Sequence, residues 1–204
     1  MTVTTQDLYG ESDGAQPALP GSYGQAPNGY RLPAGTRLGP VRLQVADLAR
    51  SLPFYVETLG FREVARDAGQ ATLAAHADDR VLVELVERRG VRPAGRGLLG
   101  LYHVAILLPD RASLGRFVRH LSESRTPAGA GDHLVSEAFY LTDPDGLGIE
   151  VYVDRPRETW HRLGRELMLA TDPVDVRGLV AEAGEVAWSG IPAGTVIGHV
   201  HLHV

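Results

Sequence analysis

The chain has 204 residues, 44% hydrophobic and 22% charged, which is the composition of an ordinary globular protein with a sizeable core. It contains no cysteine, and its 20 basic residues are all arginine, so disulfides, thiolate nucleophiles, cysteine-based zinc sites and Schiff-base lysine chemistry are excluded. The net charge of −5 and the lack of a basic patch argue against nucleic acid as a partner.

No apolar run approaches the roughly 18 residues that are needed to cross a bilayer, so no membrane partner is expected. The N-terminal residues lack the basic start and the apolar core of a secretory signal. We therefore expect a cytoplasmic protein.

Residues 1–35 contain six glycines and four prolines and show no periodicity of apolar residues. Such a stretch cannot bury enough apolar surface to offset the entropy lost on ordering. It predicts a flexible N-terminal tail.

A first structural unit begins after the tail. Apolar and polar residues alternate over Val41–Val45, which predicts a half-buried strand. Asp47 is a suitable N-cap for a helix over Leu48–Val56, and Gly60 a suitable C-cap. Three strands separated by turn residues follow, at Phe61–Arg66, Ala71–Ala75 and Arg80–Glu87. The pattern is therefore βαβββ.

The same order of elements then recurs. The strand pattern of 41–45 returns at 104–108, 63 positions later, and Asp110 follows it as the next N-cap. Glu150 takes the place of Glu84 at an offset of 66. Matched positions in a shared order indicate an internal repeat. The predicted elements of the second unit are a helix over 111–124 and strands over 135–142 and 148–153, joined by the turn Asp143–Gly146.

Two further helices are predicted at Pro156–Leu169 and Pro173–Ala183, each with proline in its first turn. Residues 197–204 then repeat the opening strand of a unit for a third time. An apolar terminal strand with an open edge pairs readily with another chain. The sequence is therefore interpreted either as the front part of a four-module protein or as a homo-oligomer that pairs through this strand.

These patterns divide the chain into a tail (1–35), a domain of two modules (36–89 and 98–154, together 36–154), a helical linker (155–196) and the first strand of an incomplete third module (197–204).

Four segments resemble the vicinal oxygen chelate superfamily, which includes glyoxalase I, bleomycin-resistance proteins and extradiol dioxygenases. They are GPVRLQVADLARSLPFYVETLGF, LYHVAILLPDRASL, DHLVSEAFYLTDPDGLGIEVY and IGHVHLHV. The nearest likeness is to two-domain bacterial proteins similar to catechol 2,3-dioxygenase, and it covers residues 36–204. The resemblance implies an α+β fold in which paired βαβββ modules form a cup-shaped mixed sheet.

The resemblance also implies a divalent metal held by His and Glu on the first and last strands of modules. His103 and Glu150 occupy those positions in the second module. Such a site suits Fe(II), with Mn, Ni or Zn as alternatives. The metal would act as a Lewis acid and as a template for two substrate oxygens.

One position departs from the family pattern. Pro40 stands where members with a site across the first two modules usually carry His, so a third ligand must come from elsewhere, with Glu84 as one candidate. By the resemblance, His199 is the first ligand of a site that further modules complete. We therefore expect His199 to stand apart from His103 and Glu150, and the first two modules to be a degenerate scaffold.

His133 has two interpretations. It lines the cup as a catalytic acid–base group or substrate contact, or its ring bonds to a backbone and fixes the loop with the help of Asp132. Tyr140 and Tyr152 lie near the proposed cup, and we interpret them as packing residues.

Three functions remain open. The first is extradiol cleavage of a catechol-type aromatic by O2 at a non-haem metal, incomplete in this chain. The second, favoured by Pro40, is a non-catalytic small-molecule binding or resistance module. The third is a glyoxalase-like metal isomerase or lyase that uses His103 and Glu150.

Overall fold

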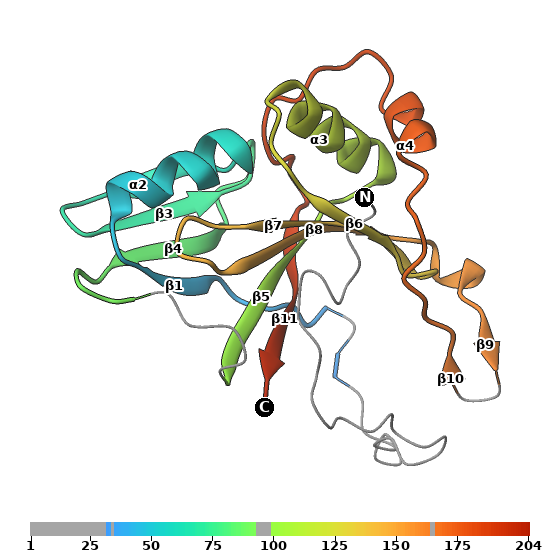
Figure 1. Ribbon diagram of the computed structural model, residues 1–204, viewed down its shortest axis with the longest axis horizontal. Helices are drawn as coiled ribbons and strands as arrows, with labels where there is room; N and C mark the ends of the chain where they lie inside the picture. The colour runs from blue at the N-terminus through green and yellow to red at the C-terminus, as the bar shows by residue number, and fades with distance from the viewer. Residues whose placement is uncertain (1–31, 34, 93–98, 164–165) are drawn as a thin grey trace. The chain divides into compact units, whose positions relative to one another are not determined.

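The computed structural model describes residues 32–33, 35–92, 99–163 and 166–204. The chain divides into two units, Met1–Arg37 and Leu38–Val204, and every helix and strand of the described residues lies in the second (Figure 1). The tail predicted at 1–35 falls almost entirely outside the described residues.

The first module builds a four-stranded sheet in the order β1-β4-β3-β2, with β1 parallel to β4 and the other pairs antiparallel. One helix, α2, packs against β3 and β4. The elements are β1 (Val41–Val45), α2 (Leu48–Pro53), β2 (Arg62–Arg66), β3 (Gln70–Ala74) and β4 (Val81–Glu87).

The predicted caps shape this first helix. The Asp47 carboxylate accepts a hydrogen bond from the Arg50 amide at 3.1 Å. Pro53 has no amide hydrogen to donate, and the helix continues after it as a wider π-helical turn over Phe54–Thr58. Gly60 ends the segment with a φ of 85°, a backbone conformation that favours glycine.

The second module builds a five-stranded sheet in the order β11-β5-β8-β7-β6. Its helix α3 is the longest, with 13 residues, and no helix in the described part of the chain could cross a membrane. The elements are β5 (Gly100–Leu107), α3 (Arg111–Glu123), β6 (Gly129–Asp132), β7 (Ser136–Thr142), β8 (Gly148–Asp154) and β11 (Val196–His203).

The two sheets share one register. In each module the first strand pairs in parallel with the last, so that Arg42 opposes Glu84 in one sheet and Ala105 opposes Glu150 in the other. Arg42 and Ala105 are 63 positions apart, and Glu84 and Glu150 are 66 positions apart. These are the offsets that relate the two halves of the sequence. The α+β class predicted from the sequence is confirmed.

The two modules are joined without a continuous sheet. Each has a sheet of its own, and β11 occupies the edge of β5 that β8 leaves open. The strand predicted at 197–204 therefore belongs to the sheet of the second module.

The turn Asp143–Gly146 links the two modules. The Asp143 carboxylate accepts a hydrogen bond from the Tyr55 hydroxyl at 2.9 Å, and both side chains are buried. The Asp145 carboxylate accepts another from the Ala46 amide at 2.8 Å and forms an ion pair with Arg50. The turn thus has a structural role.

The prediction of a helix over Pro156–Leu169 is wrong for the described residues of that range. One 3-10 turn at Arg157–Thr159 is followed by two short antiparallel strands. The Trp160 indole donates at 2.9 Å to the Arg155 carbonyl, an acceptor that a continuing helix would use. The second predicted helix is present in shortened form. These elements are β9 (Arg162–Leu163), β10 (Glu166–Leu167) and α4 (Val176–Glu182).

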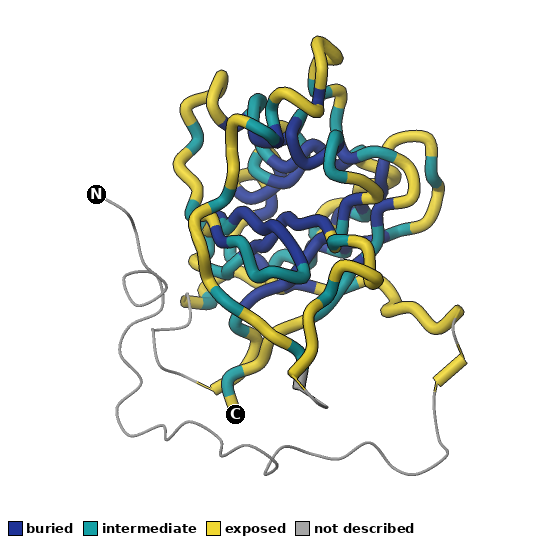
Figure 2. Tube along the Cα trace, turned by 90° about the vertical axis from the view of Figure 1, so that its right-hand side faces the viewer, coloured by how far each residue is buried: buried dark blue, intermediate teal, exposed yellow. Residues whose placement is uncertain are grey.

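One apolar core extends through Leu38–Val204 (dark blue in Figure 2). It includes residues from both sheets, from helices α2, α3 and α4 and from the segment before β11, among them Leu43, Leu85, Ile106, Phe117 and Ile191. The core and the Asp143–Gly146 turn therefore hold the two sheets together without a shared strand edge.

Substitution Tyr55→Phe removes the hydroxyl that joins the modules and leaves a buried carboxylate oxygen without its donor. We expect the free energy of unfolding, measured by urea denaturation, to fall by about 1–3 kcal/mol. Arg42→Ala is the control, because it breaks an exposed ion pair worth less than about 1 kcal/mol. Equal effects of the two changes would contradict this account.

Candidate metal centre

The sheet of the second module has one face covered by α3 and a second face, here called the site face, that carries polar side chains. Cross-strand partners point to the same face of a sheet. One row across the site face therefore consists of Tyr140, Glu150, Ala105 and His199, from β7, β8, β5 and β11 in turn. His103 lies one row away, next to His201.

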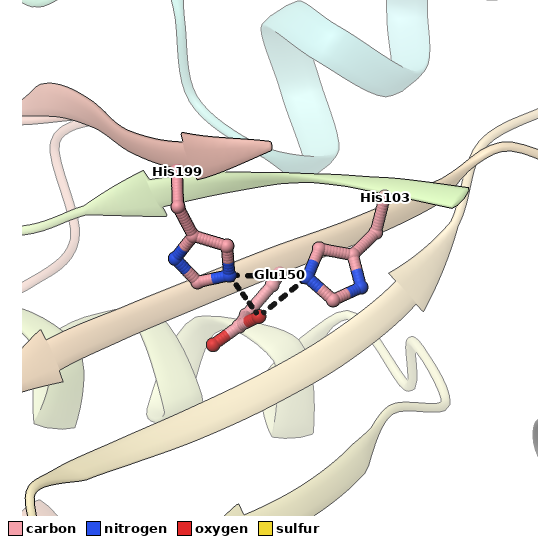
Figure 3. A group of neighbouring side chains, drawn as sticks. All are labelled: His103, Glu150 and His199. Atoms are coloured by element: carbon pink, nitrogen blue, oxygen red, sulfur yellow. Dashed lines mark hydrogen bonds and ion pairs between the residues drawn. The ribbon is translucent and has the colours of Figure 1, made fainter. Parts of the chain in front are cut away.

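Three of these side chains converge (Figure 3). Glu150 Oε2 lies 3.0 Å from His103 Nε2 and 3.2 Å from His199 Nε2, and the two imidazole nitrogens are 3.1 Å apart. The three groups come from three adjacent strands, β8, β5 and β11. They form the one cluster of potential metal ligands found among the described residues.

Burial and charge differ within the cluster. The side chains of His103 and Glu150 are 9% and 5% exposed, whereas that of His199 is 45% exposed. Burial alone would raise the pKa of Glu150, but hydrogen bonds from His103 and His199 outweigh it and lower the pKa to about 2. Glu150 is therefore an anion at neutral pH and can bind a cation.

The geometry fits a single divalent metal. Two ligand atoms about 2.1 Å from one ion and at right angles would lie about 3.0 Å apart, which matches the separations in the cluster. Two histidines and one carboxylate on one side of an ion are the donor set of non-haem Fe(II) sites with open positions.

No equivalent cluster is found in the first module, within the described range 35–92. Glu84, the counterpart of Glu150, is bound by the Arg42 guanidinium at 2.6 Å, and Pro40 offers no ligand atom. Glu84 is therefore not the missing third partner of His103.

The expectation that His199 stands apart from His103 and Glu150 is wrong. Strand β11 pairs antiparallel with β5 and brings His199 to the same point. The sequence could not show this, because the contact joins residues 96 positions apart.

His133 lies near this cluster but is not part of it. Its Nδ1 is 2.8 Å from the Ala170 carbonyl and its Nε2 is 2.6 Å from the Tyr140 hydroxyl. A carbonyl can only accept, so we assign the proton to Nδ1, and in the neutral ring Nε2 then accepts from Tyr140. The Tyr140 ring in turn lies 6.3 Å from that of His103.

Both interpretations of His133 thus have a counterpart in the structure. The backbone bond to Ala170 fixes the loop, and Asp132 helps by accepting from the Leu134 amide at 2.9 Å. The bond to Tyr140 connects the ring to the site face. Tyr140, interpreted from the sequence as a packing residue, is the link that was missed.

Comparison with known proteins identifies a family for this chain. A family model described as the glyoxalase/bleomycin resistance protein/dioxygenase superfamily matches residues 37–151. The chain belongs to this superfamily. A relative in it, catechol-2,3-dioxygenase of Bacillus subtilis (strain 168), is 47% identical over 172 residues, which are 83% of this chain and 60% of that protein. The chain therefore spans less than two thirds of that relative.

Solved structures support the superfamily fold. A glyoxalase/dioxygenase from Nostoc punctiforme aligns with a TM-score of 0.51 and 22% identity, over 62% of this chain and 98% of its own. The cppA protein of Streptococcus pneumoniae TIGR4 aligns with a TM-score of 0.50 and 13% identity, over 82% of this chain and 59% of its own. At these identities the likeness concerns the fold alone.

The tautomer of His133 is open to direct measurement. In nitrogen-15 spectra of the metal-free protein we expect Nδ1 to carry the proton, and Tyr140→Phe to shift the Nε2 signal while it leaves Nδ1 protonated. Arg42→Ala, which changes an exposed ion pair in the sheet of the first module, should leave both signals in place. A proton on Nε2 in the neutral ring would contradict the assigned direction of the hydrogen bonds.

Proposed function

We propose that His103, Glu150 and His199 together hold one divalent metal, with Fe(II) as the preferred ion and Mn, Ni or Zn as substitutes. The observation that carries this proposal is the convergence of two imidazole nitrogens and one carboxylate oxygen within 3.0–3.2 Å. An ordinary hydrogen bond would bring together only two of these groups. Three ligand groups that face one point match the coordination shell of a metal ion.

We further propose that the chain acts in extradiol cleavage of a catechol-type aromatic by O2. The name of the Bacillus subtilis relative supports this reaction, although the chain spans only 60% of that protein. The metal would supply a Lewis acid on which both catechol oxygens bind in fixed orientation.

The site face suits a flat aromatic substrate. Next to the cluster the floor is made of small buried side chains, Ala105 and Ala138, while Tyr140 and Tyr152 add aromatic surface. Aromatic rings pack favourably against such surfaces. Small residues at the floor leave room for a ring above the sheet.

His133 and Tyr140 supply the acid–base group in this proposal. Their 2.6 Å hydrogen bond lets a proton pass between the phenol and the imidazole. Tyr140 is the cross-strand neighbour of Glu150, so its hydroxyl is the member of the pair nearer to the substrate. Cytoplasmic location and a homo-oligomer formed through the terminal strand stay predictions.

The metal proposal is tested by titrating the metal-free protein anaerobically with Fe(II), and separately with Zn(II). We expect one ion per chain, and a loss of about 100-fold or more in affinity for His103→Ala, His199→Ala and Glu150→Gln, since even changes outside the coordination shell cost 10- to 100-fold. The exposed His161 provides the matched control, His161→Ala, which should bind as the wild type does. Equal affinity in all four variants would disprove this ligand set.

The reaction is tested separately with the iron-loaded protein, catechol and an oxygen electrode. Extradiol cleavage consumes one O2 per ring opened, and Glu150→Gln should abolish it. Isomerisation of an α-hydroxy carbonyl compound without O2 uptake would favour the glyoxalase-like alternative. Binding of the aromatic with no turnover would favour the binding module.

A further inference from the structure

Two irregularities interrupt the pairing of β11 with β5, and the cluster lies between them. On one side Ile197 opposes Ile106, but the next pair is His199 with Ala105, so Gly198 is an extra residue on β11. Such an extra residue is a β-bulge.

The second irregularity compensates the first. His201 opposes His103, but the next pair is Leu202 with Leu101, so Tyr102 is an extra residue on β5. The original register resumes after it. The two bulges therefore displace only the short stretch that carries His199 and His201 on β11 and His103 on β5.

The displacement decides which way His199 points. If the register of Ile197 with Ile106 simply continued, Gly198 would oppose Ala105 and His199 would oppose Val104. Val104 belongs to the core beneath α3, on the face opposite to the site. Because a slip of one residue moves a side chain to the other face, the bulge is what places His199 beside Glu150.

Close contact with Tyr152 accounts for glycine at the bulge. A Cβ atom at Gly198 would lie 2.1 Å from the Tyr152 hydroxyl oxygen and 2.8 Å from ring carbons. The Tyr152 side chain is buried, so it cannot simply swing away. The backbone at Gly198 is not left-handed, so the contact and not the backbone conformation excludes larger residues.

Tyr152 also touches the ligand that the bulge presents. Its ring centroid lies 5.3 Å from that of His199. One aromatic side chain thus packs against the bulged backbone and against the imidazole that follows it.

We propose that Gly198 and Tyr152 form a positioning pair: the glycine bulge, seated on the tyrosine ring, turns His199 onto the site face and so completes the metal ligand set. The inference rests on the proposed metal site and assigns to it two residues that contribute no ligand atom.

The test compares Gly198→Ala with His199→Ala by calorimetric titration of the metal-free chain with Zn(II). Gly198→Ala should lower the affinity by about 10- to 100-fold, the range for residues that orient a ligand. The variant that combines Gly198→Ala with His199→Ala should bind Zn(II) no more weakly than His199→Ala alone. Gly69→Ala is the matched control, because a Cβ there meets nothing within 4 Å.

A rescue separates positioning from general damage. Adding Tyr152→Phe to Gly198→Ala removes the hydroxyl oxygen, which is the closest clash at 2.1 Å, and keeps the ring that supports the bulge, so it should recover part of the lost affinity. Because this double variant relieves the closest clash, it also serves if Gly198→Ala alone fails to fold, in which case it should fold and bind Zn(II). Unchanged affinity in Gly198→Ala, or no recovery in the double variant, would overturn the proposal.

A readout without metal distinguishes this proposal from the proposed function. In metal-free wild type, nuclear Overhauser effects should connect the His199 ring with the rings of Tyr152 and His103, and Gly198→Ala should abolish them. If these effects are present and Zn(II) does not bind, the metal site fails and the positioning pair stands. If they are absent from the wild type, the positioning pair fails.

Discussion

Parallel pairing of β5 with β8 is the interaction on which the site depends. It sets Glu150 beside Ala105, and His103 is then two residues along the same strand and on the same face. A parallel pair needs a long connection, which α3, β6 and β7 provide. The chain between His103 and Glu150 therefore contributes to the sheet that buries the Glu150 carboxylate. The two imidazoles that contact this carboxylate offset the cost of its burial.

The first module shows the same framework without the chemistry. Its parallel pair carries Arg42 opposite Glu84, and the two side chains form an exposed ion pair. An arginine there supplies the positive charge that, in the proposed metal site, a cation would supply to the second module. The two modules thus share a scaffold and differ in the residues that their first and last strands carry.

Local patterns predicted most of the fold, because alternation and helix caps report on structure within a few residues. Asp47 and Asp110 both cap their helices through side-chain bonds to the backbone. Strand β6 went unpredicted, because the run GAGD lacks the branched and aromatic residues that mark strands, and it pairs with β7 through its backbone.

The site was harder to predict, because it depends on contacts that no local pattern reports. Resemblance to known proteins indicated His103 and Glu150, and the repeat placed them on neighbouring strands. To predict that His199 joins them, two further features had to be known: the pairing of β11 with β5 and the bulge at Gly198. A regular alternation carried through residue 198 would have placed His199 on the opposite face.

The position of β11 at the edge of its sheet has a kinetic consequence. Only β5 pairs with β11 in the described part of the chain, whereas β5 and β8 are each held on both sides. Edge strands open locally at a lower free energy than central ones. For a metal held at this site, fraying of β11 would release His199 first and leave His103 and Glu150 behind. The rate at which a chelator removes the ion would therefore report the opening of one strand and not the unfolding of the protein.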